Sequence, residues 1–418
     1  MTAAVAPRSE AFAALRHSDF RAYFATGLVA MMADNVEHVI TYWLIYERFH
    51  SPALAGFAVI SHWAPFLLFG ITFGALADRF DCRRIIQVGQ GLFILASFTW
   101  AVLFLTSTLE AWHAVILLIV HGFAGALWSP ASQLFLYDVV GADQLQSAVR
   151  LNATSRNLGI LFGPAVGGGL LVALGPANGL LVNCLLYLPL IALMFRTPYT
   201  GHLHHGAATA AQRTLSLGDA WRTLKDVARQ PIILAMVALA GATSFLVGNA
   251  YQSQMPQFAS DIPGAQGEVG YSVLLTASAA GAVVGGFALE WSSWLRRPRV
   301  EPAIGMGVAW AIAILLFAFT QSYLVAVVAL FATGFLNLGF SSLGQTIVQL
   351  EAPPDRRGRV VGLFSMAQSG MRVGSGLTVG ILGAAVGIHA SLGASALLAL
   401  VICAALLALA KSPRVAFG

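Results

Sequence analysis

The sequence has too few charged residues to cover the surface of a soluble protein of its size. Asp, Glu, Lys and Arg make up 10% of the 418 residues, whereas 58% are hydrophobic. Soluble globular proteins carry about 25% charged residues. A soluble globular fold is therefore excluded, and most of the apolar side chains need an environment other than water.

Cysteine is also scarce. Cys82, Cys184 and Cys403 are far apart and lack any metal or redox spacing, so we interpret them as small apolar residues. The only histidine cluster in the sequence, at 202–205, suggests metal. We favour a solvated loop there, because no further ligands lie nearby in the sequence. We therefore expect no metal site and no cofactor.

The sequence lacks the motifs of membrane-embedded enzymes and of ATP-driven pumps. It contains no nucleophile elbow, no His-Glu-x-x-His and no nucleotide-binding loop. The net charge of +5 does not indicate nucleic-acid binding, because the basic residues lie in loops between apolar blocks. We predict that the protein is not an enzyme, is not driven by ATP and binds no nucleic acid.

The sequence does contain long uncharged runs. The runs 303–319 and 392–410 hold no charge, and about 20 apolar residues span the hydrocarbon core of a bilayer. We predict an all-α membrane protein with twelve spans in two six-helix halves, residues 1–195 and 231–418, joined by a cytoplasmic linker at 196–230. The spans are predicted at 20–46, 53–77, 85–107, 112–137, 147–173, 177–195, 231–257, 268–291, 303–320, 323–349, 359–385 and 388–410.

Lysine and arginine are distributed unequally across this topology. The chain has 23 lysines and arginines. In the predicted topology, Arg48 alone lies on the outer side of the membrane, Arg156 and Arg372 lie within spans, and all others lie on the side of both termini. Cytoplasmic loops are enriched in Lys and Arg. We therefore expect a multi-pass protein of the bacterial inner membrane with both termini in the cytoplasm.

The linker contains a candidate amphipathic helix at 216–230. Its apolar stripe consists of Leu217, Trp221, Leu224 and Val227, with charged residues elsewhere on the helix. Such a helix either contacts membrane lipid at the cytoplasmic surface or simply connects the two halves.

The two halves repeat each other at an almost constant offset. The shared features are a glycine and an acid at the end of the second span, an acid at the end of the fourth, and two glycines in the fifth. The pairs lie 211 to 213 positions apart: Gly74 with Gly286, Asp78 with Glu290, Asp138 with Glu351, Gly159 with Gly370, and Gly163 with Gly374. This offset indicates a duplicated six-helix unit, typical of transporters that rock one half against the other.

Three segments resemble signatures of the major facilitator superfamily. Gly-Ala-Leu-Ala-Asp-Arg-Phe-Asp-Cys-Arg at 74–83 resembles its loop signature Gly-x-Leu-Ala-Asp-Arg-x-Gly-Arg-Arg, with Asp81 and Cys82 where the signature has Gly and Arg. Gly-Ile-Leu-Phe-Gly-Pro-Ala-Val-Gly-Gly at 159–168 resembles the span-five signature of its drug–proton antiporter branches. Pro-Asp-Arg-Arg-Gly-Arg-Val-Val-Gly-Leu at 354–363 resembles the start of span eleven in exporters similar to the enterobactin exporter. The resemblance covers the whole chain and implies the major facilitator fold.

The resemblance also implies a conformational latch that closes the cytoplasmic side in the outward-facing state. Asp78 lies at a helix C-terminus, which is unfavourable for an anion, so it needs a partner such as Arg79, Arg83 or the N-terminus of span eleven. The alternative is a plain topological charge cluster. The predicted latch residues are Gly74, Asp78, Arg79, Arg83, Asp138, Glu290, Arg296, Glu351 and Arg359.

In span five, Gly159, Gly163, Gly167 and Gly168 form a smooth stripe, and Pro164 bends the helix. In the resembling families this stripe packs against a helix of the other half and tightens the closed state. The alternative is a generic glycine packing seam.

Ionisable side chains within the predicted spans are the candidates for energy coupling. They are Asp34, Glu37, His38, His62, His121, Arg156 and Arg372. Asp34 shares a helix face with Glu37 and His38, and neighbouring buried acids cannot all stay ionised. We predict that Asp34 or Glu37 carries a proton; the alternative is a static pair with Arg156 or Arg372. The histidines at 62 and 121 are interpreted as polar packing or substrate contacts.

Trp63, Trp128 and Tyr251 are candidate residues of an amphipathic-substrate cavity. Together these features predict a monomeric, proton-coupled secondary transporter that exports a small amphipathic compound (a drug, siderophore or related metabolite) by alternating access. The alternatives are an importer or a lysophospholipid flippase of the same fold. A channel is disfavoured by the duplicated halves.

Overall fold

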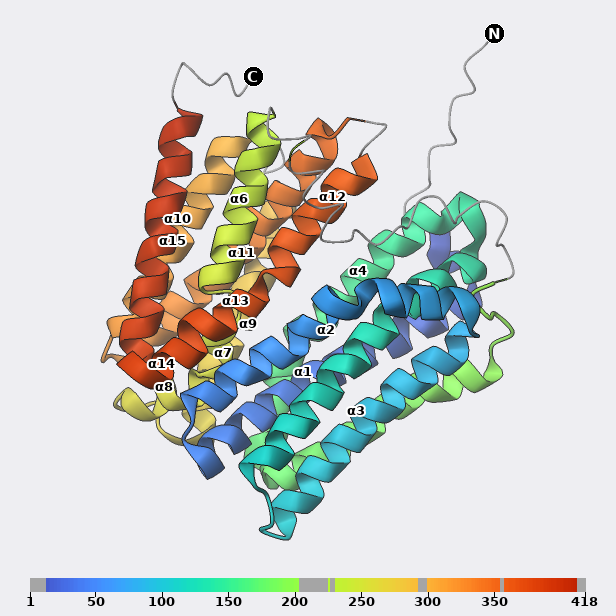
Figure 1. Ribbon diagram of the computed structural model, residues 1–418, viewed down its shortest axis with the longest axis horizontal. Coiled ribbons are helices and arrows are strands. Elements are labelled where there is room, and N and C mark those ends of the chain that lie inside the picture. Colours follow the sequence, from blue (N-terminus) through green and yellow to red (C-terminus); the bar gives the residue numbers. More distant parts are fainter. Residues whose placement is uncertain (1–12, 203–224, 226–229, 292–298, 354–356, 412–418) are drawn as a thin grey trace.

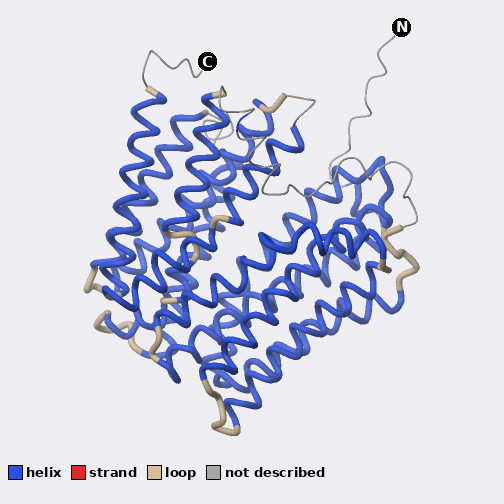
Figure 2. Tube along the Cα trace, viewed as in Figure 1, coloured by secondary structure: helices blue, strands red, loops and turns tan. Residues whose placement is uncertain are grey.

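The structure, a computed structural model, describes residues 13–202, 225, 230–291, 299–353 and 357–411. Within these ranges the chain is helical, with short connections and no β-strand (Figure 2). Several predicted features lie outside the described residues: most of the helix at 216–230, the histidine cluster beyond His202, and Arg296. The side chains of Glu290 and Arg359 are likewise outside them.

The amino-terminal half consists of η1 (Ala13–Arg16), α1 (Ser18–Phe49), α2 (Pro52–Arg79), α3 (Cys82–Leu105) and α4 (Ala111–Arg196). The long α4 is broken at Gly141 and Gly175, whose φ angles are 68° and 74°. These left-handed conformations suit glycine, and Pro176 is well placed in the first turn of the segment that follows. The predicted spans four, five and six are therefore consecutive parts of α4.

The carboxy-terminal half is built from more pieces. They are α6 (Pro231–Leu246), α7 (Ala250–Ser253), α8 (Met255–Asp261), α9 (Gly267–Trp291), α10 (Val300–Phe319), α11 (Tyr323–Glu351), α12 (Arg357–Ser365), η2 (Met366–Gly370), α13 (Arg372–Ser375), η3 (Gly376–Ile381), α14 (Leu382–Val386) and α15 (Ile388–Ala410).

Two predicted spans of this half are not continuous α-helices. The span predicted over 231–257 ends as a regular helix at Leu246, and Gly248 nearby has a φ of 46°. The span predicted over 359–385 contains two π-helical stretches, Met366–Gly370 and Gly376–Ile381. Hydropathy cannot reveal such wide turns, which are frequent at functional sites.

Nine helical segments of the described chain are long and apolar enough to cross a membrane. The helix α1 is not among the nine, and its sequence includes Asp34, Glu37 and His38. The predicted all-helical membrane fold is confirmed, whereas the count of twelve spans stays a prediction.

The same close contact occurs in both halves. A Cβ atom at Gly122 in α4 would overlap the carbonyl group of Ser61 in α2, and one at Gly334 in α11 would overlap that of Ser278 in α9. The two glycines are 212 positions apart, which is the offset found between the sequence repeats. Close helix approach at small residues is the usual way in which membrane helices pack.

The two halves form helical bundles that diverge toward the side on which both termini lie (Figure 1). On the opposite side they are joined. The Tyr271 hydroxyl of α9 donates a hydrogen bond to the Val39 carbonyl of α1 at 2.7 Å. The Gln254 side-chain amide donates to the Pro52 carbonyl at the start of α2, also at 2.7 Å. We call this side, opposite the termini, the closed side.

Candidate functional site

The middle of α1 carries the centre of the candidate site. Asp34, Glu37 and His38 lie near the middle of this helix of 32 residues, so each is about 16 Å or more from either helix end. Asp34 and Glu37 are buried, with 8% and 1% of their surface exposed. Buried acids at this depth need polar partners, because an unpaired charge is costly in a membrane.

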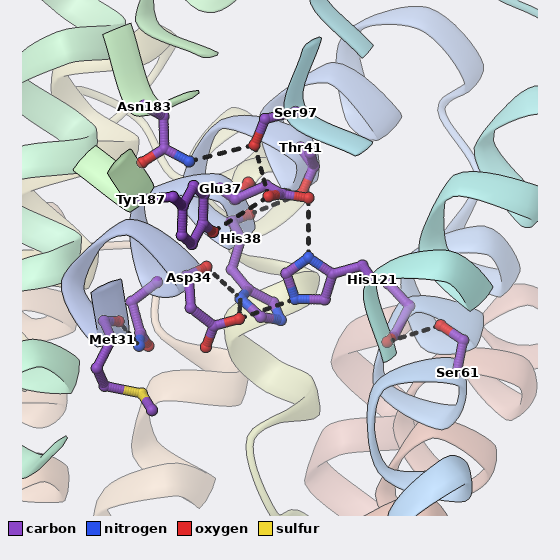
Figure 3. Close-up of polar contacts among 12 residues, drawn as sticks. Met31, Asp34, Glu37, His38, Thr41, Ser61, Ser97, His121, Asn183 and Tyr187 are labelled. Atoms are coloured by element: carbon purple, nitrogen blue, oxygen red, sulfur yellow. Dashed lines mark hydrogen bonds and ion pairs between the residues drawn. The ribbon is translucent and has the colours of Figure 1, made fainter. Parts of the chain in front are cut away.

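Glu37 has partners from three further helical segments (Figure 3). One carboxylate oxygen, Oε1, lies 2.8 Å from Nδ1 of His121 in α4. The other, Oε2, accepts hydrogen bonds from the Ser97 hydroxyl at 2.6 Å and the Tyr187 hydroxyl at 3.3 Å. Asn183 in turn donates to the Ser97 hydroxyl at 3.3 Å. Both oxygens of this carboxylate thus have polar partners, although the side chain has almost no contact with solvent.

His121 lies between the two acids. Its Nδ1 faces Glu37, and its Nε2 lies 3.0 Å from Oδ1 of Asp34. The imidazole is itself 5% exposed and packs edge-on against Phe93 at 4.8 Å between ring centroids. One ring thus bridges two carboxyl groups of the neighbouring helix, an arrangement able to hold or pass a proton.

Two more histidines complete the cluster. The His38 ring contacts the rings of His62 and His121, with centroids 4.7 Å and 4.6 Å away. His38 Nδ1 lies 2.7 Å from the main-chain carbonyl of Asp34. Because a carbonyl only accepts, this nitrogen carries the proton in that bond. We call Asp34, His38, His62 and His121 the His–Asp cluster.

The two intramembrane arginines do not pair with the acids. Within the described residues, both acids pair with His121, Asp34 also lies 3.9 Å from His38 Nδ1, and no ion pair of either acid with Arg156 or Arg372 is present. Arg156 is exposed on α4. Arg372 places its guanidinium over the Trp63 ring at 4.9 Å, so it connects the two halves by a cation–π contact. The static arginine pair considered from the sequence is therefore absent from this structure.

The three aromatic candidates occupy different surroundings. Trp63 is half-buried and contacts both His62 and Arg372, which places it beside the His–Asp cluster. Trp128 is buried on α4 and packs edge-on against Phe93. Tyr251 is buried in α7, with its hydroxyl 3.4 Å from that of Ser278. Of the three, Trp63 is the one in direct contact with the cluster.

The loop between α2 and α3 has a local ion pair. Arg83 binds Asp81, with Nη2 and Oδ2 2.7 Å apart, and its Nη1 donates to the Thr197 carbonyl at 2.8 Å. Asp81 also caps α3 by accepting from the Arg83 main-chain N–H at 2.9 Å. Burial raises the pKa of the Asp81 carboxyl, and the hydrogen bonds and charge of Arg83 lower it by more, so it lies below its usual value.

The other described latch residues differ in their exposure to solvent. Asp78 and Arg79 are exposed at the end of α2, half-buried Gly74 precedes them, and Glu351 is exposed at the end of α11, whereas Asp138 is buried. Arg83, a predicted partner of Asp78, is bound to Asp81 instead. The latch stays a prediction for a state in which these helix ends meet.

The glycine stripe of span five packs differently from the expectation. A Cβ at Gly159, Gly163 or Gly167 would collide with α1, at Met31, Asn35 and Val36 or Val39 respectively. These three glycines therefore bring α4 close to α1 of the same half. Gly168 alone of the four meets the other half, at Ser272 of α9. Pro164 lies within this part of α4.

A second glycine contact, which the sequence reasoning missed, joins the halves on the closed side. A Cβ at Gly56 in α2 would lie 2.6 Å from Cα of Gly380 and 2.7 Å from the carbonyl oxygen of Gly376, both in η3. Small residues spaced four apart in span eleven were the available signal, but only the fold shows that they face α2. Ser97, Asn183 and Tyr187 were missed as well, because single polar residues in apolar spans give no local pattern.

Comparison with known proteins agrees with this architecture. Residues 9–416 match the profile of a major facilitator family described as transmembrane secretion effector. Similar proteins include the enterobactin exporter EntS of Shigella boydii, 24% identical over 87% of this chain and 85% of that protein, and the multidrug efflux pump Tap of Mycolicibacterium fortuitum, 25% identical over 87% and 89%. The MFS-type transporter YfiS of Bacillus subtilis is 24% identical over 82% of this chain and 83% of that protein.

Solved structures show the same fold. The nucleoside transporter NupG superposes with a TM-score of 0.71 at 15% identity, covering 94% of this chain and 100% of that structure. The D-xylose–proton symporter superposes with a TM-score of 0.69 at 15% identity, covering 93% and 97%. These proteins are transporters rather than enzymes, as the missing catalytic motifs led us to expect. The chain belongs to the transmembrane secretion effector family of major facilitator transporters.

Proposed function

We propose that this transporter is a proton-coupled exporter that moves a small amphipathic compound out of the cytoplasm by alternating access. The observation that carries the proposal is the single imidazole of His121 held between Asp34 and Glu37 at the middle of α1, 3.0 Å and 2.8 Å from the two carboxylates. A proton shared among these groups changes the charge of the site, and charge in a membrane interior is costly enough to drive a change of conformation.

The direction of transport is supported by the relatives. EntS is named an exporter of enterobactin and Tap a multidrug efflux pump. A drug, siderophore or related metabolite is therefore the proposed substrate class. With the termini in the cytoplasm, as the arginine distribution predicts, the joined side faces outward and the structure corresponds to an inward-facing state ready to load from the cytoplasm.

The test uses inside-out membrane vesicles, in which export appears as uptake. Vesicles with an acidic lumen are offered ethidium, Hoechst 33342 and enterobactin in turn. We expect at least one compound to accumulate, and nigericin, which collapses the pH gradient, to abolish the accumulation. Uptake into right-side-out vesicles instead would identify an importer, and accumulation that persists with nigericin would reject proton coupling.

Neutral variants locate the coupling site. Asp34→Asn and Glu37→Gln keep the shape of the side chains but cannot ionise. At least one is expected to lose gradient-driven accumulation while retaining exchange of labelled substrate at equal pH. Asp261→Asn is the matched control, because this acid lies in the other half, paired with His389 at 3.1 Å. If both cluster variants concentrate substrate normally, the coupling site lies elsewhere.

A further inference from the structure

Four side chains of types that commonly bind metals meet in the amino-terminal half. Asp34 and His38 come from α1, His62 from α2 and His121 from α4. One ligating atom from each lies within 4.8 Å of all the others. Imidazole is a preferred ligand of zinc, nickel and related ions, and three imidazoles beside one carboxylate form a recognisable donor set for them. Their positions in the sequence, on three different helices, conceal this grouping.

Several of these groups are buried with no hydrogen bond. Within the described residues, Oδ1 of Asp34, Nδ1 of His62 and Nε2 of His121 are buried polar atoms without a hydrogen-bond partner. Oδ1 of Asp34 and Nε2 of His121 lie 3.0 Å apart but are not aligned as a hydrogen bond. Leaving such a buried polar atom unsatisfied carries a desolvation cost. A cation bound between these buried atoms would accept several of their lone pairs at once.

The surrounding hydrogen bonds orient two of the rings as metal ligands are oriented. A metal-bound histidine usually donates its other ring N–H to a carboxylate or a backbone carbonyl. His121 Nδ1 faces Glu37 Oε1 at 2.8 Å, and His38 Nδ1 faces the Asp34 carbonyl at 2.7 Å. With the protons on Nδ1, both Nε2 atoms offer lone pairs. Glu37 is itself held by Ser97 and Tyr187.

We propose that Asp34, His38, His62 and His121 bind a divalent first-row transition-metal ion such as Zn²⁺ or Co²⁺, with Glu37 orienting His121 from outside the ligand shell. Four donors complete a tetrahedral site, whose edges are about 3.3 Å for bonds of about 2.0 Å. The 3.0 Å separation of Asp34 and His121 is near this value. Within the described residues, His62 Nδ1 makes no hydrogen bond, so binding an ion through this nitrogen breaks none.

The donor set also determines which ions fit. Mg²⁺ and Ca²⁺ take oxygen ligands, and a site with three imidazoles does not suit them. Four protein donors fill the tetrahedral positions around the ion. No position is left for an organic chelator, so the ion binds without one. The ion and the proton of the proposed function would use the same Asp34 and His121 atoms, so they compete for this position. The inference rests on the geometry of the side chains and holds whichever direction transport runs.

Titration of purified, untagged protein in detergent with Co²⁺ tests the site. We expect one ion per chain, visible absorption bands of tetrahedral Co²⁺, and displacement by Zn²⁺. His62→Gln removes one donor and breaks no described hydrogen bond. Glu37→Gln keeps all four donors and is expected to weaken binding about ten- to a hundredfold, as outer-shell changes do. His62→Gln is expected to weaken it at least as much and to alter the absorption bands.

Two control variants separate this site from other histidines. His389→Gln removes the ring paired with Asp261 in the other half, and its Co²⁺ binding should equal that of the parent. The combined variant His202→Gln, His204→Gln and His205→Gln should likewise leave the binding of the first equivalent of Co²⁺ unchanged. Absence of stoichiometric Co²⁺ binding, or unchanged affinity and bands in folded His62→Gln, would falsify the metal site. The binding assay uses no gradient, so its failure is independent of failure of proton-coupled export in vesicles.

Discussion

Tyr271 of α9 and Val39 of α1 are joined by a hydrogen bond of 2.7 Å between the hydroxyl and the main-chain carbonyl, across the boundary of the two halves. The Tyr271 ring also stacks on Trp43, at 5.6 Å between centroids. Both contacts lie on the closed side and are buried. They must break if the halves are to separate on this side during alternating access.

Tyr271→Phe should therefore destabilise the structure described here relative to a state in which the halves separate on this side. The change keeps the ring stack and removes a hydrogen bond that contributes about 0.5–1.5 kcal/mol. Distances between spin labels placed at exposed positions on the closed side should shift toward longer values. Tyr323→Phe, a half-buried tyrosine at the start of α11, is the control and should leave them unchanged. An unaltered distribution in Tyr271→Phe would show that this bond does not hold the halves together.

The glycine contact between α2 and η3 leads to a second prediction. Gly56→Ala places a methyl group where Cα of Gly380 and the carbonyl of Gly376 already lie, at 2.6 Å and 2.7 Å. Backbone atoms cannot yield as a flexible side chain does, so the halves must move apart. Gly70→Ala is a matched control in the same helix, because nothing lies within 4 Å of its new methyl group.

The expected readout is thermal unfolding of the two purified variants. Gly56→Ala should lower the unfolding temperature, since overpacking costs about 1–3 kcal/mol. Gly70→Ala should be neutral or slightly stabilising, because alanine favours helix over glycine. Equal unfolding temperatures for Gly56→Ala and the parent would mean that the contact between α2 and η3 accommodates the methyl group without loss of stability.

Much of the fold could be predicted from the sequence, because hydropathy reports directly on helices that face lipid. The ranges of α2, α10 and α15 follow from uncharged runs, and α1 differs from them through its buried polar residues. The breaks after Leu246 and at the two π-helical stretches could not be predicted, because they change backbone geometry without changing apolar content.

The candidate site could be predicted only in part. The helical spacing of Asp34, Glu37 and His38 places them together, since residues three and four apart share a face. The partner of Glu37 could not be found this way, because His121 is 84 positions away on another helix. A static pair with an arginine is the alternative that the sequence leaves open, whereas the structure places a histidine between the two acids. Contacts between helices are determined by packing, which local spacing does not encode.

Asp81 offers a prediction about acid sensitivity outside the membrane. Its pKa is held below the usual value, because the bonds from Arg83 outweigh the effect of burial. A lowered folded-state pKa stabilises the fold above the normal carboxyl pKa of about 4, and this stability is lost as pH falls through the folded value. Asp81→Asn should be less stable than the parent at pH 7, and the difference in unfolding temperature should shrink below pH 4. A constant difference across this range would contradict the assignment.

The orientation of the chain is testable with single cysteines in a background lacking Cys82, Cys184 and Cys403. Gln266 and Lys411 are both exposed, and they adjoin the start of α9 and the end of α15 respectively. The arginine distribution places Gln266 outside and Lys411 inside. In intact cells, a membrane-impermeant maleimide should label Gln266→Cys and not Lys411→Cys, whereas both should react after permeabilisation. The reverse pattern would invert the topology and make the described state outward-facing.

The predicted latch is the counterpart of the closed side. Asp78 and Arg79 are exposed here, and within the described residues neither forms an ion pair. The predicted latch would form only in a state in which these helix ends meet. Asp78→Asn removes the anion from the closed form while leaving the contacts of the present state intact. A partly buried charged hydrogen bond contributes about 1.5–3 kcal/mol, so the outward-facing population should fall by roughly tenfold or more.

Spin labels at Glu351 and at the end of α2 would measure this fall in Asp78→Asn. It would appear as a loss of the short-distance population that the parent shows under conditions that favour the outward-facing state. Arg84→Gln is the control, because the described contacts of the Arg84 side chain are a hydrogen bond to the Gln87 side chain at 2.9 Å and a cation–π contact with Phe195. A short-distance population in Asp78→Asn equal to that of the parent would leave these residues as a topological charge cluster without a role in closure.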